Sequence, residues 1–355
     1  AGDIGASSMM ERGLNHIRTG ATIAGLGWNL TTAFLQPLGL TQSIVRIGWA
    51  PVARGAKAFI AHPWKTIDQV ESRSEFMKHR AATMNREIND VLNRVRNDKM
   101  SRIEGSFFYM IQALQKVADM PTWLGEYEKQ IAAGNDEARS IALADQAVMD
   151  AQGAGQMKDL SAIQRGVGPW GAAKKLFTNF YSYFNVTYNL AVERGRATEF
   201  KDPMAVGKLA VDYLMLFTVP AVLGTLLKEL VRGSDDDWDK EKLLKKLAKE
   251  QLNYLMGTMV LTREVGAAIT GDYGYSGPAG VRLFAEINKL AKQVEQGEVD
   301  TALVKAAINV AGIAGLPVIG QFPSGQINRT IDGVVAVSEG TAGPQAVIFG
   351  APLKH

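Results

Sequence analysis

Apolar residues are spaced along the chain in a helical pattern almost throughout. They recur every three or four residues, and we find no run of alternating apolar and polar residues bounded by turn signals. Gly and Pro residues divide the pattern into segments of helix length, with a clear break at His62-Pro63. The pattern therefore predicts an all-α fold of about a dozen or more helices with an extended outline.

The segment 72–98 carries the clearest heptad-like spacing. Its apolar residues follow one another at intervals of four, three, four, three and four residues, which is typical of a coiled-coil seam. We expect one helix over this segment and association with other copies of the chain along the seam. The predicted oligomer seam consists of Met77, Met84, Ile88, Val91 and Val95, with Ala81 after the first of them.

Three arginines, Arg73, Arg80 and Arg94, lie in one row of this predicted helix, at multiples of seven residues. A regular row of guanidinium groups suits non-specific contact with the phosphates of duplex DNA. The alternative is that the arginines pair with carboxylates on the same or a neighbouring helix. The carboxylates in question are Glu71, Glu75 and Glu87.

The uncharged segment 176–192 predicts an aromatic helix. Five of its aromatic residues fall on one helical face, which suits either burial by neighbouring helices or contact with a membrane interface. These residues are Phe177, Phe180, Tyr181, Phe184 and Tyr188.

The most apolar window is 209–227, which is roughly long enough to cross a bilayer. It contains Asp212 and is interrupted by Pro220 and Gly224, so a core helix is favoured and a membrane-competent helix is the alternative. Its candidate membrane-contacting or helix-packing residues are Leu214, Leu216, Phe217, Leu223 and Leu226.

Other segments complete the predicted architecture. Residues 19–45 carry no charge and predict two short buried helices around a turn. Helices are expected over 105–119 and 135–152, the second opening with Asn135-Asp136-Glu137 as a capping residue followed by acids, and Pro121 is expected to open a short helix between them.

Composition divides the chain into three regions. The last 90 residues hold 14 of the 36 glycines. Within them, the small-residue-rich stretch 302–320 suits close packing between helices, and the end from Gln321 is expected to be irregular apart from a helix near 326–338. Such a segment has little core of its own, so it should wrap around other subunits or another part of the same chain. The regions are an N-terminal helical region (1–155), an aromatic and apolar helical region (156–265) and a Gly-rich interaction segment (266–355).

The composition offers little for catalysis. The chain of 355 residues has no Cys and four His, none of them spaced as metal ligands, and its 39 Lys and Arg against 36 Asp and Glu leave a net charge of +3. Phosphate-binding loops, dinucleotide fingerprints, zinc motifs and nucleophile elbows are absent. We therefore expect no cofactor, no metal and no enzymatic activity. The sequence starts at Ala1, so we expect it to be a processed product or a piece of a longer polypeptide.

Three segments carry a resemblance to a known group of proteins. They are LTTAFLQPLGLTQSI (30–44), SRSEFMKHR with the following NREI (72–80 and 85–88), and FTNFYSYFNVTYN (177–189). Over roughly residues 20–235, the chain resembles the C-terminal helical region of large polyvalent proteins of phages and of the giant internal, or ejection, proteins of short-tailed phages. These motifs are helical and compositional and carry no catalytic signature.

The resemblance implies a structural role. Such proteins are packaged inside the capsid, leave through the tail before the genome, and help to form a conduit for genome delivery across the host envelope. It implies as partners other copies of the chain, other phage ejection proteins and portal or tail proteins, with duplex DNA and the host membrane as further contacts. The alternatives are a membrane-active pore-forming protein and the non-catalytic tail end of a virion-packaged polymerase.

Overall fold

The computed structural model has an all-α fold, as the apolar spacing predicts. It describes residues 2–80, 88, 106–153, 182–232, 240–257, 286–288, 290–292, 294–295, 300–316 and 320–352. Within these ranges no strand occurs, and the nearest approach to one is a single bridge between Leu316 and Gly320.

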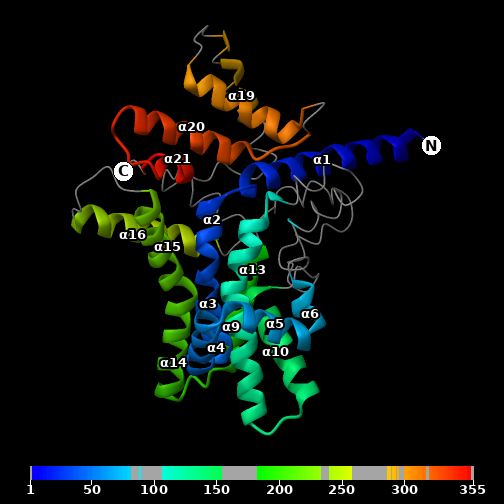
Figure 1. Cartoon of the computed structure of the whole chain (residues 1–355), viewed down its shortest axis with the longest axis vertical. Coiled ribbons are helices and arrows are strands. Elements are labelled where there is room, and N and C mark those ends of the chain that lie inside the picture. Colours follow the sequence, from blue (N-terminus) through cyan, green and yellow to red (C-terminus); the bar gives the residue numbers. More distant parts are fainter. Residues whose placement is uncertain are drawn as a thin grey trace.

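The helices form a lower bundle and an upper layer, joined by a middle group (Figure 1). The bundle contains α3 (Leu40–Ile47), α4 (Trp49–Ala61), α5 (Pro63–Arg73), α6 (Glu75–Lys78), α9 (Tyr109–Ala132), α10 (Glu137–Gln152), α13 (Ser182–Ala197) and α14 (Pro203–Tyr213). The upper layer contains α1 (Gly2–Leu26), α19 (Thr301–Ala314), α20 (Ser324–Ser338) and α21 (Ala346–Phe349). Between them lie α2 (Leu30–Leu35), the 3₁₀ turn η1 (Gln36–Gly39), the π-helical turn η4 (Leu214–Thr218), α15 (Val219–Arg232) and α16 (Lys240–Gly257).

Helix α9 is central to the bundle and crosses α4 at very short range. A Cβ atom on Gly55 of α4 would lie 2.1 Å from the carbonyl oxygen of Pro121, and one on Gly125 of α9 would lie 2.2 Å from that of Pro51. Each helix therefore places a glycine against the proline carbonyl of the other. The expectation that Pro121 opens a separate helix is wrong, because α9 continues through it. Pro121 has no backbone N–H, so α9 lacks one helical hydrogen bond there, and tertiary packing with α4 offsets that loss.

The segment predicted as one helix over 72–98 is interrupted at its start. Helix α5 ends at Arg73, and Ser74 adopts an extended conformation in which its Oγ accepts a hydrogen bond from the Met77 N–H at 3.0 Å. Ser74 is thus an N-cap that begins the short helix α6. The prediction of a continuous helix is wrong here, because a capping serine outweighed the heptad spacing. Of residues 81–98, only Ile88 is described.

The buried apolar residues form several clusters. One surrounds Trp123 of α9 and brings together α5, α6, α9 and α10. A second contains Ile23, Ala33 and Phe108 and joins α1 and α2 to the start of α9. A third contains Val45 of α3, Leu190 of α13 and Leu216 of η4. The uncharged stretch 19–45 is largely buried, as expected, and it forms the end of α1, α2, η1 and most of α3.

The two ends of the described chain pack together in the upper layer (Figure 1). A Cβ on Gly20 of α1 would lie 2.0 Å from the Ile313 carbonyl oxygen of α19, and one on Gly325 of α20 would lie 2.3 Å from the Ala24 carbonyl oxygen. His16 Nε2 lies 2.7 Å from the Ala314 carbonyl oxygen. The predicted helix near 326–338 is confirmed as α20, and the last region packs against another part of the same chain. After α20, the described end of the chain also contains the short helix α21, which was not expected.

The predicted region boundaries near residues 155 and 265 lie outside the described residues. The three predicted regions nevertheless share interfaces, because α3 contacts α13 and η4, and α1 contacts α19 and α20.

Candidate functional site

Arg80, predicted to face DNA, is buried in the bundle instead. Its Nε donates to Asp119 Oδ2 at 2.9 Å, and the two side chains are only 4% and 1% exposed. Its guanidinium carbon also lies 5.6 Å from the ring centroid of Phe76. The prediction that Arg80 contacts phosphates is wrong, because a carboxylate 39 residues further along the chain neutralises it inside the fold.

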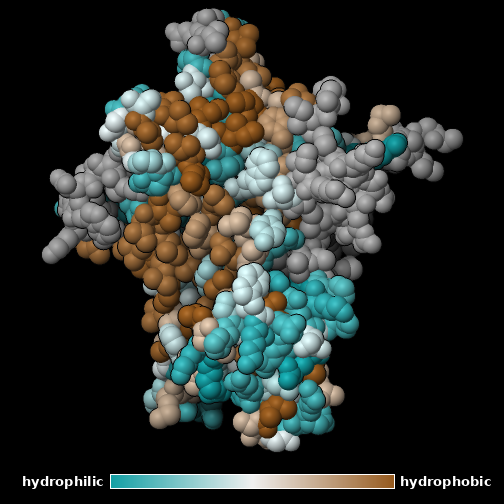
Figure 2. Space-filling view, in the orientation of Figure 1, coloured by the Kyte–Doolittle hydropathy of each residue, from teal (hydrophilic) through white to brown (hydrophobic). Residues whose placement is uncertain are grey.

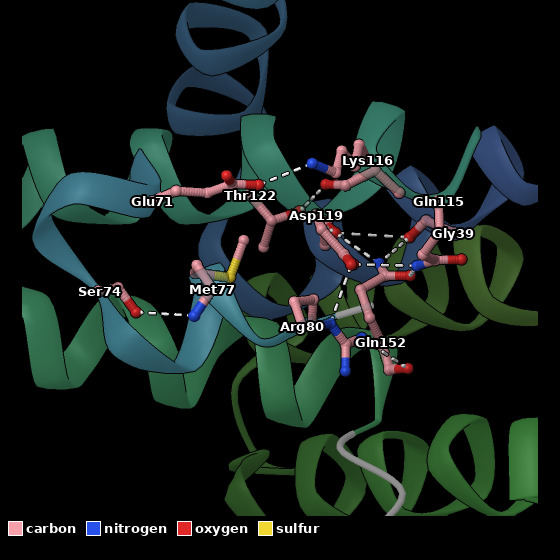
Figure 3. Close-up of polar contacts among 12 residues, drawn as sticks. Gly39, Glu71, Ser74, Met77, Arg80, Gln115, Lys116, Asp119, Thr122 and Gln152 are labelled. Atoms are coloured by element: carbon pink, nitrogen blue, oxygen red, sulfur yellow. Dashed lines mark hydrogen bonds and ion pairs between the residues drawn. The ribbon is translucent and has the colours of Figure 1, made fainter. Parts of the chain in front are cut away.

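A polar network extends from this ion pair between four helical elements (Figure 3). Asp119 Oδ1 accepts from Gln115 Nε2 at 2.9 Å, and the same nitrogen lies 3.2 Å from Gln152 Oε1. Gln152 Nε2 then donates to the Gly39 carbonyl at 2.7 Å and to Ser43 Oγ at 2.9 Å. The network thereby ties α9, the end of α10, η1 and α3 to one another. Buried networks of this kind fix the register between helices, so we assign this one a structural role.

Arg73 lies at the surface of the bundle and is partly engaged there. Its Nε is 3.7 Å from Glu137 Oε1, and its guanidinium carbon lies 5.6 Å from the ring centroid of Tyr127. The described geometry therefore favours the ion-pair alternative over a DNA-facing row. Arg94 and its possible partner Glu87 lie outside the described residues.

The other two carboxylates named as possible partners pair elsewhere. Glu71 Oε1 accepts from Lys116 Nζ at 2.6 Å, which ties α5 to α9. Glu75 pairs within its own turn, at 3.2 Å from Lys78 Nζ and 3.3 Å from His79 Nε2. Sequence spacing identified the type of partner for the arginines but not the partners themselves.

Two residues of the predicted oligomer seam are buried inside this chain. Met77 packs in the cluster around Trp123, whereas Ile88 packs in a different cluster with Phe108. They cannot form one continuous seam for another copy, so that prediction is wrong for these two residues. Met84, Val91 and Val95 lie outside the described residues.

A second polar contact within the bundle involves Asp145 of α10. Its Oδ1 accepts from Ser74 Oγ and from Trp123 Nε1, both at 2.6 Å. Burial raises the pKa of this carboxyl, and the two hydrogen bonds oppose that rise in part. The contact joins the α5–α6 break to α9 and α10.

The described part of the predicted aromatic face is divided between burial and exposure. Phe184 is half-buried, and its ring meets that of Tyr254 edge-on at 5.9 Å. Tyr188 is exposed to solvent. The other three residues of that face, Phe177, Phe180 and Tyr181, lie outside the described residues.

The apolar window 209–227 lies within a helix that runs unbroken from Pro203 to Arg232 through α14, η4 and α15. The π-helical turn stands immediately before Pro220, where the helix lacks a backbone N–H. This helix is the one candidate in the described chain that is long and apolar enough to cross a membrane, and only 28% of its most apolar window is buried.

The side chains of this helix divide into an inner and an outer set. Leu216 is buried against α3 and α13, and Phe217 and Leu226 are half-buried. Leu214 and Leu223 are exposed, as are Met204, Val211 and Leu230. Figure 2 shows the result as apolar surface over α15 and the adjoining part of α14, whereas hydrophilic surface covers the lower end over α9 and α10.

The single acid in the middle of the helix is turned toward the protein. Asp212 Oδ2 lies 4.0 Å from Arg194 Nε of α13, and its side chain is largely buried. Between Lys208 and Lys228 no other charged residue occurs. These nineteen residues of helix extend about 28 Å, which is close to the roughly 30 Å thickness of a bilayer's hydrocarbon core.

The described part of the chain holds no group of three or more His, Asp or Glu residues placed to bind a metal ion.

The buried polar contacts of the bundle are the structural feature that sequence reasoning missed. Their signal was present in Gln42 and Ser43, two buried polar residues in a stretch without charged residues. Gln42 Nε2 donates to Thr187 Oγ1 of α13 at 2.7 Å, and Ser43 Oγ lies 2.5 Å from Thr122 Oγ1 of α9. Polar side chains in such a stretch require partners, because an unpaired buried polar group is costly.

Comparisons with known proteins found no matching family model, curated protein or solved structure.

Proposed function

We propose that this chain is a structural, non-enzymatic segment of an internal virion protein of a phage, ejected through the tail to help form a conduit for genome delivery across the host envelope. The observation that carries the proposal is the Pro203–Arg232 helix, which is long and apolar enough to cross a bilayer and has only 28% of its most apolar window buried. A protein that is stored in water and later acts in an envelope needs such a surface.

Two further features support the proposal. The described helices are tied together by buried polar contacts and ion pairs, as in the network around Asp119, which suits a scaffold. The uncovered apolar surface also suits assembly with other copies or with other ejection, portal or tail proteins before release, since large exposed patches mark interfaces. Its location is accordingly the virion interior and then the host envelope.

The first experiment asks where the chain resides. Purified particles and infected-cell envelopes are probed with an antibody against the chain, before and after ejection is triggered. We expect the chain in mature particles and, after ejection, in the envelope fraction. Absence from mature particles would overturn the proposal.

The second experiment asks whether the helix is responsible. Leu214→Asp and Leu230→Asp place charges on exposed positions of the helix, and Ile131→Asp places one on an exposed apolar residue of α9 as the matched control. We expect the first two variants to enter particles but to leave the envelope fraction in carbonate washes, whereas the control stays. Membrane retention of all three variants would show that this helix does not carry the function.

A pore-forming protein is the second candidate, because the same exposed helix favours it. Such a protein permeabilises vesicles by itself and has no place in the virion. Dye release from vesicles by the purified chain, together with its absence from particles, would favour the pore former.

A further inference from the structure

A second exposed apolar surface lies at the opposite side of α4 from its contact with α9. Trp49 and Ile60 are eleven residues apart on α4, which is three helical turns, so both lie on one face. Ile60 is 80% exposed, and Trp64, which follows at the start of α5, is 82% exposed. We call Trp49, Ile60 and Trp64 with the neighbouring cations Arg54, Lys57 and Lys65 the α4–α5 face.

The α4–α5 face is held rigidly from behind. Pro51, Val52 and Gly55 are buried, and Gly55 lies against the backbone of α9 at a distance that no larger residue permits. The exposed side chains therefore cannot turn inward by a rotation of α4. Their exposure is a property of the fold.

Cations outnumber anions around the face. The chain contains no Asp or Glu between Glu11 and Asp68. Arg54, Lys57 and Lys65 are exposed, and within the described residues none of them forms an ion pair with a carboxylate. The face thus combines bulky apolar side chains with three cations that no carboxylate pairs with, and the anion that lies nearest along the chain is the exposed Asp68, one turn after Trp64 on α5.

We propose that the α4–α5 face lies on the surface of an anionic lipid bilayer, with α4 parallel to the membrane plane. An amphipathic helix of about 20 Å that presents Trp and Ile flanked by Lys and Arg suits the headgroup region, where the rings enter the acyl boundary and the cations meet lipid phosphates. Duplex DNA offers phosphates but no general place for three apolar side chains, so charge and hydrophobicity together favour lipid.

This inference takes its biological setting from the proposed envelope role but concerns a different surface from the Pro203–Arg232 helix. It assigns the membrane two separate contacts with the chain. A headgroup contact at the α4–α5 face needs no unfolding, whereas insertion of the long helix breaks the Asp212–Arg194 contact. The α4–α5 face can therefore bind the membrane first.

The test uses the full chain and flotation with vesicles of phosphatidylethanolamine and phosphatidylglycerol, compared with phosphatidylcholine alone. All variants carry Leu214→Asp and Leu230→Asp, so that the long helix does not mask the result. In that background we expect Lys57→Gln to lower the partition coefficient roughly fivefold, because one cation near an anionic surface contributes about 1 kcal/mol. Trp64→Ser should lower it roughly tenfold through lost apolar burial.

Matched controls are placed on other elements. Arg139→Gln removes an exposed cation of α10, and Tyr109→Ser removes an exposed aromatic ring of α9, and both should bind as the background does. Brominated lipids should quench Trp fluorescence in the background and less in Trp64→Phe, and least in the double variant Trp49→Phe with Trp64→Phe. Circular dichroism confirms that every variant compared is folded.

Three outcomes overturn the inference: Lys57→Gln and Trp64→Ser bind vesicles like their controls, the face binds duplex DNA in preference to anionic vesicles, or it is covered in solution by a second copy of the chain. Each of these leaves the proposed function standing if the chain is found in particles. The converse result is a chain that is absent from particles and yet binds vesicles in a Trp64-dependent manner. That result refutes the proposed function and leaves the inference about the α4–α5 face standing.

Discussion

Removing the charge of Asp119 should destabilise the bundle far more than any surface substitution. Asp119→Asn keeps the shape of the side chain but leaves the Arg80 guanidinium, which is 4% exposed, without its counter-charge. A buried ion pair that loses one partner typically costs about 3–5 kcal/mol, and the retained amide oxygen places this variant near the lower end, at about 3 kcal/mol.

Urea unfolding followed by circular dichroism measures the loss. With a denaturant dependence of about 3 kcal/mol per molar urea, a change of about 3 kcal/mol lowers the midpoint by roughly 1 M. The matched control is Lys116→Met, which breaks the half-exposed pair with Glu71 and should cost at most about 1 kcal/mol.

A double replacement sharpens the test. Arg80→Met with Asp119→Leu removes both charges and fills the site with apolar groups, so it should be more stable than Asp119→Asn alone. If Asp119→Asn unfolds at the same urea concentration as the wild type, the pair is not buried as described, and the register argument for the network fails with it.

Three further predictions concern packing, pH and the surface arginine. Gly55→Ala should destabilise the chain by about 1–3 kcal/mol, because its Cβ would lie 2.1 Å from the Pro121 carbonyl oxygen. Gly207→Ala, whose Cβ would have nothing within 4 Å, should stabilise the chain by about 0.5–1 kcal/mol. Thermal unfolding of the two variants measures the difference. The pKa of Asp145 is raised in the folded state. Its stabilising contribution to the free energy of unfolding is therefore fully present below the unfolded pKa of 3.8 and is lost as pH rises through the folded pKa. The stability of Asp145→Asn relative to the wild type should therefore increase with pH over that window, and a pH-independent difference in urea midpoints would contradict this. Arg73→Ala should leave the salt dependence of any DNA binding unchanged in a filter-binding titration, because Arg73 already contacts Glu137 and Tyr127; a shallower salt slope would restore the phosphate-facing alternative.

Local signals in the sequence predicted much of the fold. The pattern Asn135-Asp136-Glu137 predicted the start of α10 to within one residue, and the capping residue is Asp136, whose Oδ1 accepts from the Arg139 N–H at 2.7 Å. The break at His62-Pro63 separates α4 from α5 as expected. Both features depend on residues within one helical turn, so a single stretch of sequence contains their cause.

The failures have causes that lie far along the chain. Pro121 stays inside α9 because α4, some sixty residues earlier, packs on it through Gly55. Arg80 has the same local surroundings as an exposed arginine of a heptad, and only the distant Asp119 decides its burial. Ser74 is the exception, since its capping role was local but was overlooked in favour of the heptad spacing.

The candidate surfaces were predictable in part. The length and composition of the 209–227 window identified the apolar helix, but not which of its leucines face outward, because α3 and α13 cover one side of it. The α4–α5 face gave no comparable signal, since Trp49, Ile60 and Trp64 are exposed only because the other side of α4 packs on α9.

The packing of α1 against α19 and α20 sets an order for the synthesis of this protein. His16 and Ala314 are 298 positions apart, so the ribosome must add almost three hundred residues before α1 meets its partners. At about 5–20 residues per second, α1 waits roughly 15–60 s with its packing face open. During this interval nascent chains on one messenger can associate through it, and a chaperone or an early-bound sister protein has time to occupy it. The upper layer therefore closes last, after the lower bundle has already formed.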